Sequence, residues 1–182
     1  MFRLDMFIHL DAVDRKVWAG KPDDRPLTEL GRQQAERMAE VLTTDPIDAL
    51  VSSPALRCPE SMQALSKATG LDVQIMPGFR DTLGYRAPEG WGKEGQPDPL
   101  GGAQSAGSAF AALSELRDRF PDGRVVLCSY GDIIPALLAF ISGQYGVGMP
   151  PNSRERGAVF TVELDGEAGT LSTGNPPEDF PK

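Results

Sequence analysis

The chain contains one histidine, and its place in the sequence is typical of a residue at the end of a buried strand. His9 is the only histidine among 182 residues. It lies near the end of the segment from Phe2 to Leu10, in which the even positions and also Phe7 are apolar, and this pattern predicts a strand covered on both faces. A lone imidazole at such a place is either a structural residue or, where other polar groups converge on it, a nucleophile or general base. The residues that the fold brings to His9 decide between these interpretations.

Several other residues could act together with this imidazole on an anion. Arg57 follows a predicted strand-to-helix turn, where a guanidinium either faces solvent or binds a phosphate with its fork of donors. Arg15 either decorates a loop or contacts the same anion. Tyr130 and Gly131 precede a predicted helix, whose first amides would suit an anion, and the Tyr130 side chain either packs or donates its hydroxyl proton.

The elements that must position these residues alternate along the chain. The predicted strands cover residues 2–10, 47–54, 71–76, 124–129 and 158–166, and the predicted helices cover 28–42, 58–70, 105–120 and 131–142. Thr28 is a predicted N-cap and Gly70 a predicted C-cap. Residues 84–102, with six glycines and three prolines, are predicted to form a loop or lid. The alternation predicts an α/β fold with a mainly parallel sheet, whose strands carry ligand-binding residues at their carboxyl ends.

Composition and charge restrict the classes of partner. A chain with 40% hydrophobic and 24% charged residues is expected to form one globular domain, here residues 1–174, followed by a flexible, proline-rich tail at 175–182. A net charge of −8 disfavours nucleic acid polymers and anionic membranes, so a phosphorylated ligand must bind in a local basic pocket.

The cysteines and the apolar runs bear on location and cofactors. Cys58 and Cys128 fall in different predicted elements, which favours free thiols in a reduced, cytoplasmic compartment over a disulfide. The N-terminal segment lacks the pattern of an export signal, and no apolar run is long enough to span a bilayer. With one histidine and no paired cysteines, we expect no metal and no cofactor. The sequence offers no prediction of the oligomeric state.

Motifs in this order and spacing resemble the histidine phosphatase superfamily, which is also called phosphoglycerate mutase-like. The segments that carry the resemblance are "IHLDA", "DRPLTELGRQQAERMAEVL", "DALVSSPALRCPESM", "GFRDTLGY" and "VVLCSYGDIIPALLAFI", and they extend over nearly the whole chain. The segments "LRCPESM", "IPALL" and "NSRERG" are most similar to small histidine phosphatase domains that accompany actinobacterial Nudix hydrolases.

The resemblance implies a three-layer α/β/α sandwich whose pocket holds a phosphoryl-accepting histidine, a second histidine, two arginines and an acid. His9 matches the phosphoryl acceptor and Arg57 matches one arginine. Arg15 lies where a phosphate contact is usual, and Asp81 lies where a glutamate acid is expected. The chain also departs from the pattern, because Tyr130 stands in the place of the second histidine.

The residues beside His9 depart from the pattern too. Ile8 stands where an arginine is expected and Leu10 where a glycine is expected. Removing one preorganised donor from an active site typically lowers the rate by about 10²- to 10³-fold. The sequence therefore predicts a protein that binds a phosphate ester and is catalytically impaired or inactive.

Two alternatives remain open at this stage. One is an active phosphomonoesterase with His9 as nucleophile, Arg57 and Arg15 as phosphate clamps, Tyr130 as donor and Asp81 as acid. The other is a structural or partner-binding domain with a relic pocket. This alternative would be favoured if the side chains of residues 8 and 10 filled the cleft. The ligand itself is not predicted.

Overall fold

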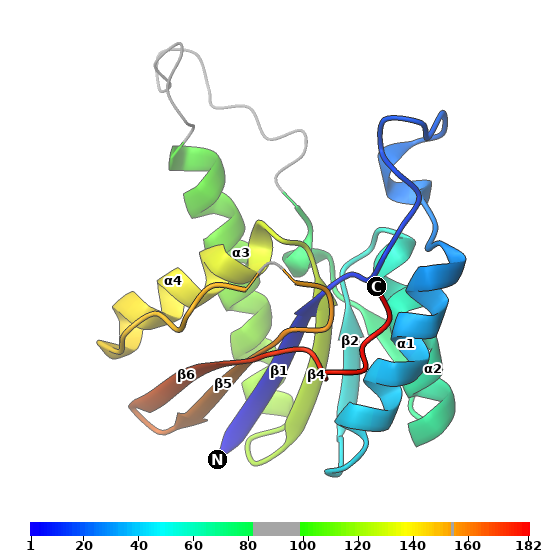
Figure 1. Cartoon of the computed structure of the whole chain (residues 1–182). Helices are drawn as coiled ribbons and strands as arrows, with labels where there is room; N and C mark the ends of the chain where they lie inside the picture. The colour runs from blue at the N-terminus through cyan, green and yellow to red at the C-terminus, as the bar shows by residue number, and fades with distance from the viewer. Residues whose placement is uncertain (82–98, 154) are drawn as a thin grey trace.

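The computed structural model describes residues 1–81, 99–153 and 155–182, and this part of the chain forms one six-stranded sheet between two layers of helices (Figure 1). The strands are β1 (Phe2–Ile8), β2 (Ala49–Ser52), β3 (Val73–Ile75), β4 (Arg124–Ser129), β5 (Val159–Asp165) and β6 (Ala168–Gly174). Their spatial order is β3-β2-β4-β1-β5-β6. The first four pair in parallel, and β5 and β6 continue the sheet as an antiparallel hairpin. The predicted α/β fold with a mainly parallel sheet is confirmed.

Four α-helices and two short 3-10 turns connect the strands in the described part of the chain. They are α1 (Glu29–Leu42), α2 (Arg57–Thr69), α3 (Pro99–Arg119), α4 (Ile133–Tyr145), η1 (Pro22–Asp24) and η2 (Pro77–Phe79). The first two helices pack together beyond one face of the sheet and the last two beyond the other (Figure 1). Among the helices described, none combines the length and the apolar character that a bilayer span requires.

The predicted capping residues at the start of α1 and the end of α2 are confirmed. The Thr28 hydroxyl accepts a hydrogen bond from the Gly31 amide and caps α1, and Gly70 ends α2 with a φ of +73°. The start of α3 differs from the prediction, because the helix begins at Pro99 rather than at Ser105. Proline suits the first turn of a helix, and Ala106 and Ala109 are buried, so packing outweighs the low helix propensity of the nearby glycines. Residues 99–102 are therefore helical, whereas the remainder of the predicted loop up to residue 98 lies outside the described residues.

The central strands carry the apolar core. Phe2, Leu4, Met6 and Phe7 of β1 are at most 1% exposed, and residues 125–128 of β4 are completely buried. A strand covered on both faces needs apolar residues at successive positions, and the run at residues 125–128 of β4 shows this pattern. The two cysteines, at positions 58 and 128, are buried free thiols.

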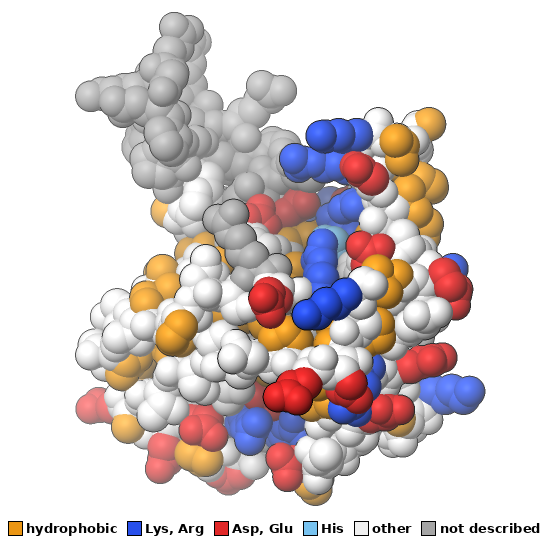
Figure 2. All heavy atoms as spheres, in the orientation of Figure 1, with side chains coloured by type: hydrophobic (Ala, Val, Ile, Leu, Met, Phe, Trp, Pro, Cys, Tyr) orange, Lys and Arg blue, Asp and Glu red, His pale blue; other side chains and the backbone are white. Residues whose placement is uncertain are grey.

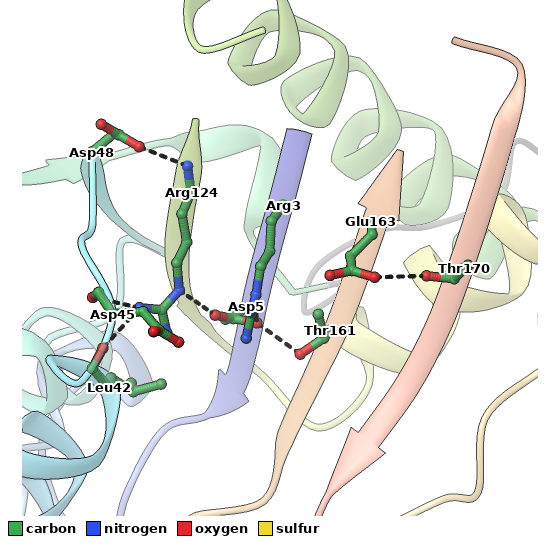
Figure 3. A network of polar contacts seen from close by, with 9 residues as sticks. All are labelled: Arg3, Asp5, Leu42, Asp45, Asp48, Arg124, Thr161, Glu163 and Thr170. Carbon is green, nitrogen blue, oxygen red and sulfur yellow. Dashed lines mark hydrogen bonds and ion pairs between the residues drawn. The ribbon is translucent and has the colours of Figure 1, made fainter. Parts of the chain in front are cut away.

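One charged residue is buried within this apolar sheet (Figure 3). The Asp5 carboxylate, on β1, accepts hydrogen bonds from Arg124 Nε at 2.7 Å, Thr161 Oγ1 at 2.7 Å and Arg3 Nε at 3.1 Å. Arg124 in turn donates to the carbonyls of Leu42 and Asp45, both at 2.8 Å. A buried charge is tolerated only when it is paired and hydrogen-bonded, and this network meets that requirement.

The last residues of the chain pack against the domain. Phe180 is 5% exposed and belongs to the core, the Pro181 carbonyl accepts a hydrogen bond from Gln34 Nε2 at 2.9 Å, and Asp179 pairs with Arg37. The prediction of a flexible tail from residue 175 is thus corrected for its last residues. The proline content of this segment suggested a mobile end, but the Phe180 side chain packs into the core and holds the last residues against the domain.

Candidate active site

A pocket of about 440 Å³ opens at the carboxyl ends of the parallel strands. Its walls are formed by His9, Arg15, Trp18, Gly20, Pro22, Arg25, Arg57, Asp81, Tyr130, Gly131 and Asp132. Figure 2 shows the pale blue of the chain's one histidine recessed among blue basic side chains. The structure therefore brings together every residue that the sequence singled out for the site. The end of β1 supplies the histidine, the start of α2 supplies Arg57, and the residues after β4 supply Tyr130 and Gly131.

His9 is held in one orientation by its own neighbourhood. Its side chain is 8% exposed, and Nδ1 lies 2.9 Å from the Leu10 carbonyl oxygen. Because a carbonyl oxygen only accepts, Nδ1 must donate, and the hydrogen-bond pattern assigns the neutral tautomer with its proton on Nδ1. The opposite nitrogen, Nε2, then carries a lone pair. Burial, together with the positive charges of Arg156, Arg57 and Arg25, lowers the pKa of His9 to about 3.

Arg57 is the most deeply buried cation of the pocket. It is 5% exposed, and its Nη1 donates to the Pro22 carbonyl at 3.0 Å. Its Cζ atom lies 5.1 Å from the centroid of the Tyr130 ring, which is the geometry of a cation–π contact. Its Nε is buried and has no hydrogen-bond partner among the described residues. A buried N–H without a partner costs about 1–3 kcal/mol, so this donor requires an explanation.

Tyr130 packs beneath that guanidinium and remains protonated. The side chain is 4% exposed, and its hydroxyl oxygen accepts a hydrogen bond from the Ala55 amide at 3.2 Å. Burial raises the pKa of Tyr130, so its hydroxyl keeps its proton at neutral pH. The residue can donate that proton to an anion, but it brings no positive charge where the resemblance implies a second imidazole.

The two apolar replacements beside His9 do not occupy the pocket. Leu10 is completely buried in the core, and Ile8 is half-buried. Neither side chain belongs to the described pocket wall, although a Cβ placed on Gly131 would lie 3.6 Å from Ile8 Cδ1. Among the described residues, the side chains at positions 8 and 10 therefore do not fill the cleft, which is the feature that would favour a relic pocket.

Sequence reasoning missed several residues near His9. Arg25 is half-buried in the pocket wall, and its Nη1 donates to the Val13 carbonyl at 2.7 Å. Trp18 forms another part of the wall and is fixed by a bond from Nε1 to the Lys21 carbonyl at 2.8 Å. Arg25 lies in the segment "DRPLTELGRQQAERMAEVL", which carries the family resemblance, and that signal could have suggested it.

A fourth arginine lies outside the pocket wall and contacts His9 from the side. Arg156 Nη1 donates to the His9 main-chain carbonyl and lies 3.5 Å from His9 Nδ1. The motif "NSRERG" contains this residue, but nothing in that motif indicates a contact with a histidine 147 positions away. Together with Arg15, Arg25 and Arg57 of the pocket wall, Arg156 brings the guanidinium groups around His9 to four among the described residues.

Comparison with known proteins gives a consistent result. Residues 12–93 match the family described as the histidine phosphatase superfamily (branch 1), a range that begins just after His9. No curated protein sequence matches the chain significantly.

Three solved structures illustrate the similarity in fold. YhfR from Bacillus stearothermophilus is 17% identical over 94% of this chain and 95% of its own, with a TM-score of 0.74. The protein histidine phosphatase SixA, in complex with tungstate, is 20% identical over 93% of each chain, with a TM-score of 0.65. The mycobacterial glucosyl-3-phosphoglycerate phosphatase, in complex with inorganic phosphate, is 22% identical over 96% of each chain, with a TM-score of 0.64.

The family model thus matches somewhat less than half of the chain, and the fold is similar to that of solved phosphatases of this superfamily over nearly the whole chain. At these identities the solved structures establish the fold and not the activity.

Proposed function

We propose that this protein binds a phosphate ester or inorganic phosphate in the His9 pocket and turns esters over slowly or not at all. The observation that carries the proposal is the buried Nε of Arg57, which has no hydrogen-bond partner among the described residues and belongs to a side chain that lines the pocket with His9. A tetrahedral oxyanion would satisfy this donor and would neutralise part of the charge of the surrounding arginines. Tyr130, in the place of a second imidazole, supplies a neutral donor only, which is the reason to expect slow chemistry.

The proposal is tested first by binding. Calorimetry with phosphate and with a simple phosphomonoester is expected to show saturable binding to the wild-type protein, with a large loss of affinity in Arg57→Met. Arg117→Met is the matched control, because Arg117 is half-buried and donates to the Tyr145 hydroxyl and the Gly166 carbonyl away from the pocket. Failure of the wild-type protein to bind either ligand at millimolar concentration would overturn the proposal.

An active phosphomonoesterase is the second candidate, and the tautomer of His9 favours it. Nε2, which carries the lone pair, would attack phosphorus while the bond from phosphorus to the leaving oxygen breaks. Asp81, a residue of the pocket wall, would give its proton to that oxygen, and water would then cleave the phosphohistidine to release phosphate.

Turnover of an aryl phosphate separates these two candidates. Slow turnover that disappears in His9→Ala would agree with a phosphate-binding protein that keeps residual activity at His9. Turnover equal to that of family members with two histidines would refute the proposal that the site is catalytically impaired. Turnover that persists in His9→Ala would exclude His9 as the nucleophile.

Three finer statements belong to the same proposal. We propose a subfamily relationship with the domains that accompany actinobacterial Nudix hydrolases, supported by "LRCPESM", "IPALL" and "NSRERG". We also propose a cytoplasmic location, supported by two free, buried thiols. The acidic overall charge supports a small anionic ligand rather than a nucleic acid polymer.

A further inference from the structure

The segment that enters β5 places a guanidinium against the main chain of His9. β5 runs antiparallel to β1 with Phe7 opposite Val159, so the residues just before β5 lie alongside the residues just after β1. Arg156, which is half-buried there, donates from Nη1 to the His9 carbonyl. The His9 amide donates to the Ser129 carbonyl of β4 at 2.9 Å. The backbone of the histidine is therefore held from both neighbouring strands.

A tight turn directs Arg156 toward His9. The Ala158 amide donates to the Glu155 carbonyl at 3.3 Å, and Gly157 within this turn has a φ of +86°. A Cβ on Gly157 would lie 2.6 Å from Phe180 Cζ, so only glycine fits both the backbone conformation and the packed ring. The direction of the Arg156 side chain is thus fixed by a backbone that has little freedom to relax.

The position of this guanidinium has a chemical consequence for the imidazole. His9 Nδ1 already donates to the Leu10 carbonyl, and a guanidinium has only donors, so Arg156 cannot bond to that nitrogen without displacing its proton. What Arg156 adds at 3.5 Å is positive charge beside the ring, which disfavours a second proton on Nε2. The same charge is the second cause, after burial, of the low pKa of His9.

We propose that Arg156 is a positioning residue that fixes the His9 main chain and keeps Nε2 unprotonated, so that a lone pair faces the phosphorus of a bound ester. The proposal rests on the proposed function, because it assumes that this nitrogen faces the ligand. Ile8 brings no guanidinium to His9, and Arg156 brings one from the turn before β5. Within the described part of the chain, the other titratable side chains of the pocket wall are Arg15, Arg25, Arg57, Asp81, Tyr130 and Asp132, and the Asp11 carboxylate acts on Arg156.

The single histidine makes a direct test possible. In ligand-free, ¹⁵N-labelled protein, long-range imidazole correlation spectra report only His9, and they give its tautomer and its titration midpoint. The wild-type spectrum is expected to show the Nδ1-protonated neutral ring from pH 8 down to at least about pH 5, since the pKa of His9 is lowered to about 3. A wild-type ring that carries its proton on Nε2, or that titrates near 6.5, would overturn the proposal without any variant.

The variants separate charge from hydrogen bonding. In Arg156→Gln the titration midpoint is expected to rise by about one to two pH units, because a like charge is removed while burial remains. Arg156→Lys keeps a charge and is expected to titrate closer to the wild type than Arg156→Gln does, and this variant provides the comparison if the glutamine variant does not fold. Arg117→Gln, a half-buried arginine far from the pocket, is the control and should leave the spectrum unchanged. An unchanged midpoint in folded Arg156→Gln, or equal shifts in the lysine and glutamine variants, would refute the role.

This experiment is independent of the binding test. A wild-type protein with the expected imidazole spectrum but no phosphate binding would contradict the proposed function and leave the effect of Arg156 on His9 intact. A protein that binds phosphate while Arg156→Gln leaves the His9 spectrum unchanged would contradict the positioning role alone.

Discussion

Substitution of Arg57 by methionine gives the sharpest test of the pocket, because the structure predicts little change in stability without ligand and a clear difference from the wild type with ligand. Methionine would forfeit the bond to the Pro22 carbonyl, worth about 1.5–3 kcal/mol for a charged donor, and the contact with Tyr130, worth about 0.5–2 kcal/mol. It would also remove a buried N–H without a partner, which costs about 1–3 kcal/mol, together with the cost of burying a charge. These contributions nearly cancel. We therefore expect ligand-free Arg57→Met to unfold within about 2–4 °C of the wild type, which corresponds to about 1 kcal/mol for a domain of this size.

Phosphate should separate the two proteins. A ligand at 100 times its Kd stabilises the folded state by about 2.7 kcal/mol, which corresponds to about 5–10 °C in the wild-type protein. The variant, without the buried donor, should show almost none of this increase. Differential scanning calorimetry with and without phosphate, at constant ionic strength, measures both quantities, and Arg117→Met reports the effect of losing an arginine elsewhere.

Two results would refute this reasoning. A full phosphate-dependent increase in Arg57→Met would mean that the unpartnered Nε does not bind the oxyanion. A loss of more than about 4 kcal/mol in ligand-free Arg57→Met would mean that Arg57 has a structural role, since losses of that size arise from severe disruption of a core or a buried network.

Three further predictions concern stability. The folded-state pKa of His9, about 3, lies below its usual value of 6.5, so the unfolded chain binds a proton first and the free energy of unfolding falls as the pH drops from 6.5 toward 3. His9→Gln should remove about 2 kcal/mol of this fall between pH 7 and pH 5, as measured by urea unfolding at each pH. An equal pH dependence in both proteins would contradict the lowered pKa. Asp5→Ala should lower the free energy of unfolding by about 3–5 kcal/mol, because it leaves Arg124 without the carboxylate that pairs with it. A urea midpoint like that of the wild type would show that the network contributes little. Gly157→Ala should destabilise the folded protein by about 1–2 kcal/mol or more, because the φ of Gly157 is +86° and the Phe180 ring must move. Thermal unfolding measures this loss, and Gly102→Ala is the control because its added Cβ meets nothing within 4 Å.

Local sequence signals were sufficient for most of the elements. The Thr28 cap, the Gly70 cap and the apolar run of β1 each depend on residues within a few positions of one another, so a short segment contains all the information needed. The α3 start illustrates the limit of such signals. Residues 99–102 contain a proline and two glycines, and only the packing of the following alanines makes the helix preferable there.

The composition of the site was also partly readable from the sequence. In a parallel sheet the carboxyl ends of the strands meet at one edge, so placing His9, Tyr130 and the segment before Arg57 at strand ends was enough to predict that they converge. The resemblance to a family added Arg15 and Asp81. The tautomer of His9 and the unpartnered Nε of Arg57 depend on atomic positions and could not be derived in this way.

By itself, the sequence determined the order of the elements and the edge of the sheet at which a single imidazole would meet an anion, because periodicity and capping act over a few residues. Only the tertiary structure decided that Arg156 contacts His9 across 147 positions and that Phe180 packs on Gly157. Both contacts follow from the antiparallel pairing of β5 with β1 and from the space left beside it. Such contacts between distant residues depend on the register of the strands and on how side chains fill the core, and no short segment of the chain contains that information.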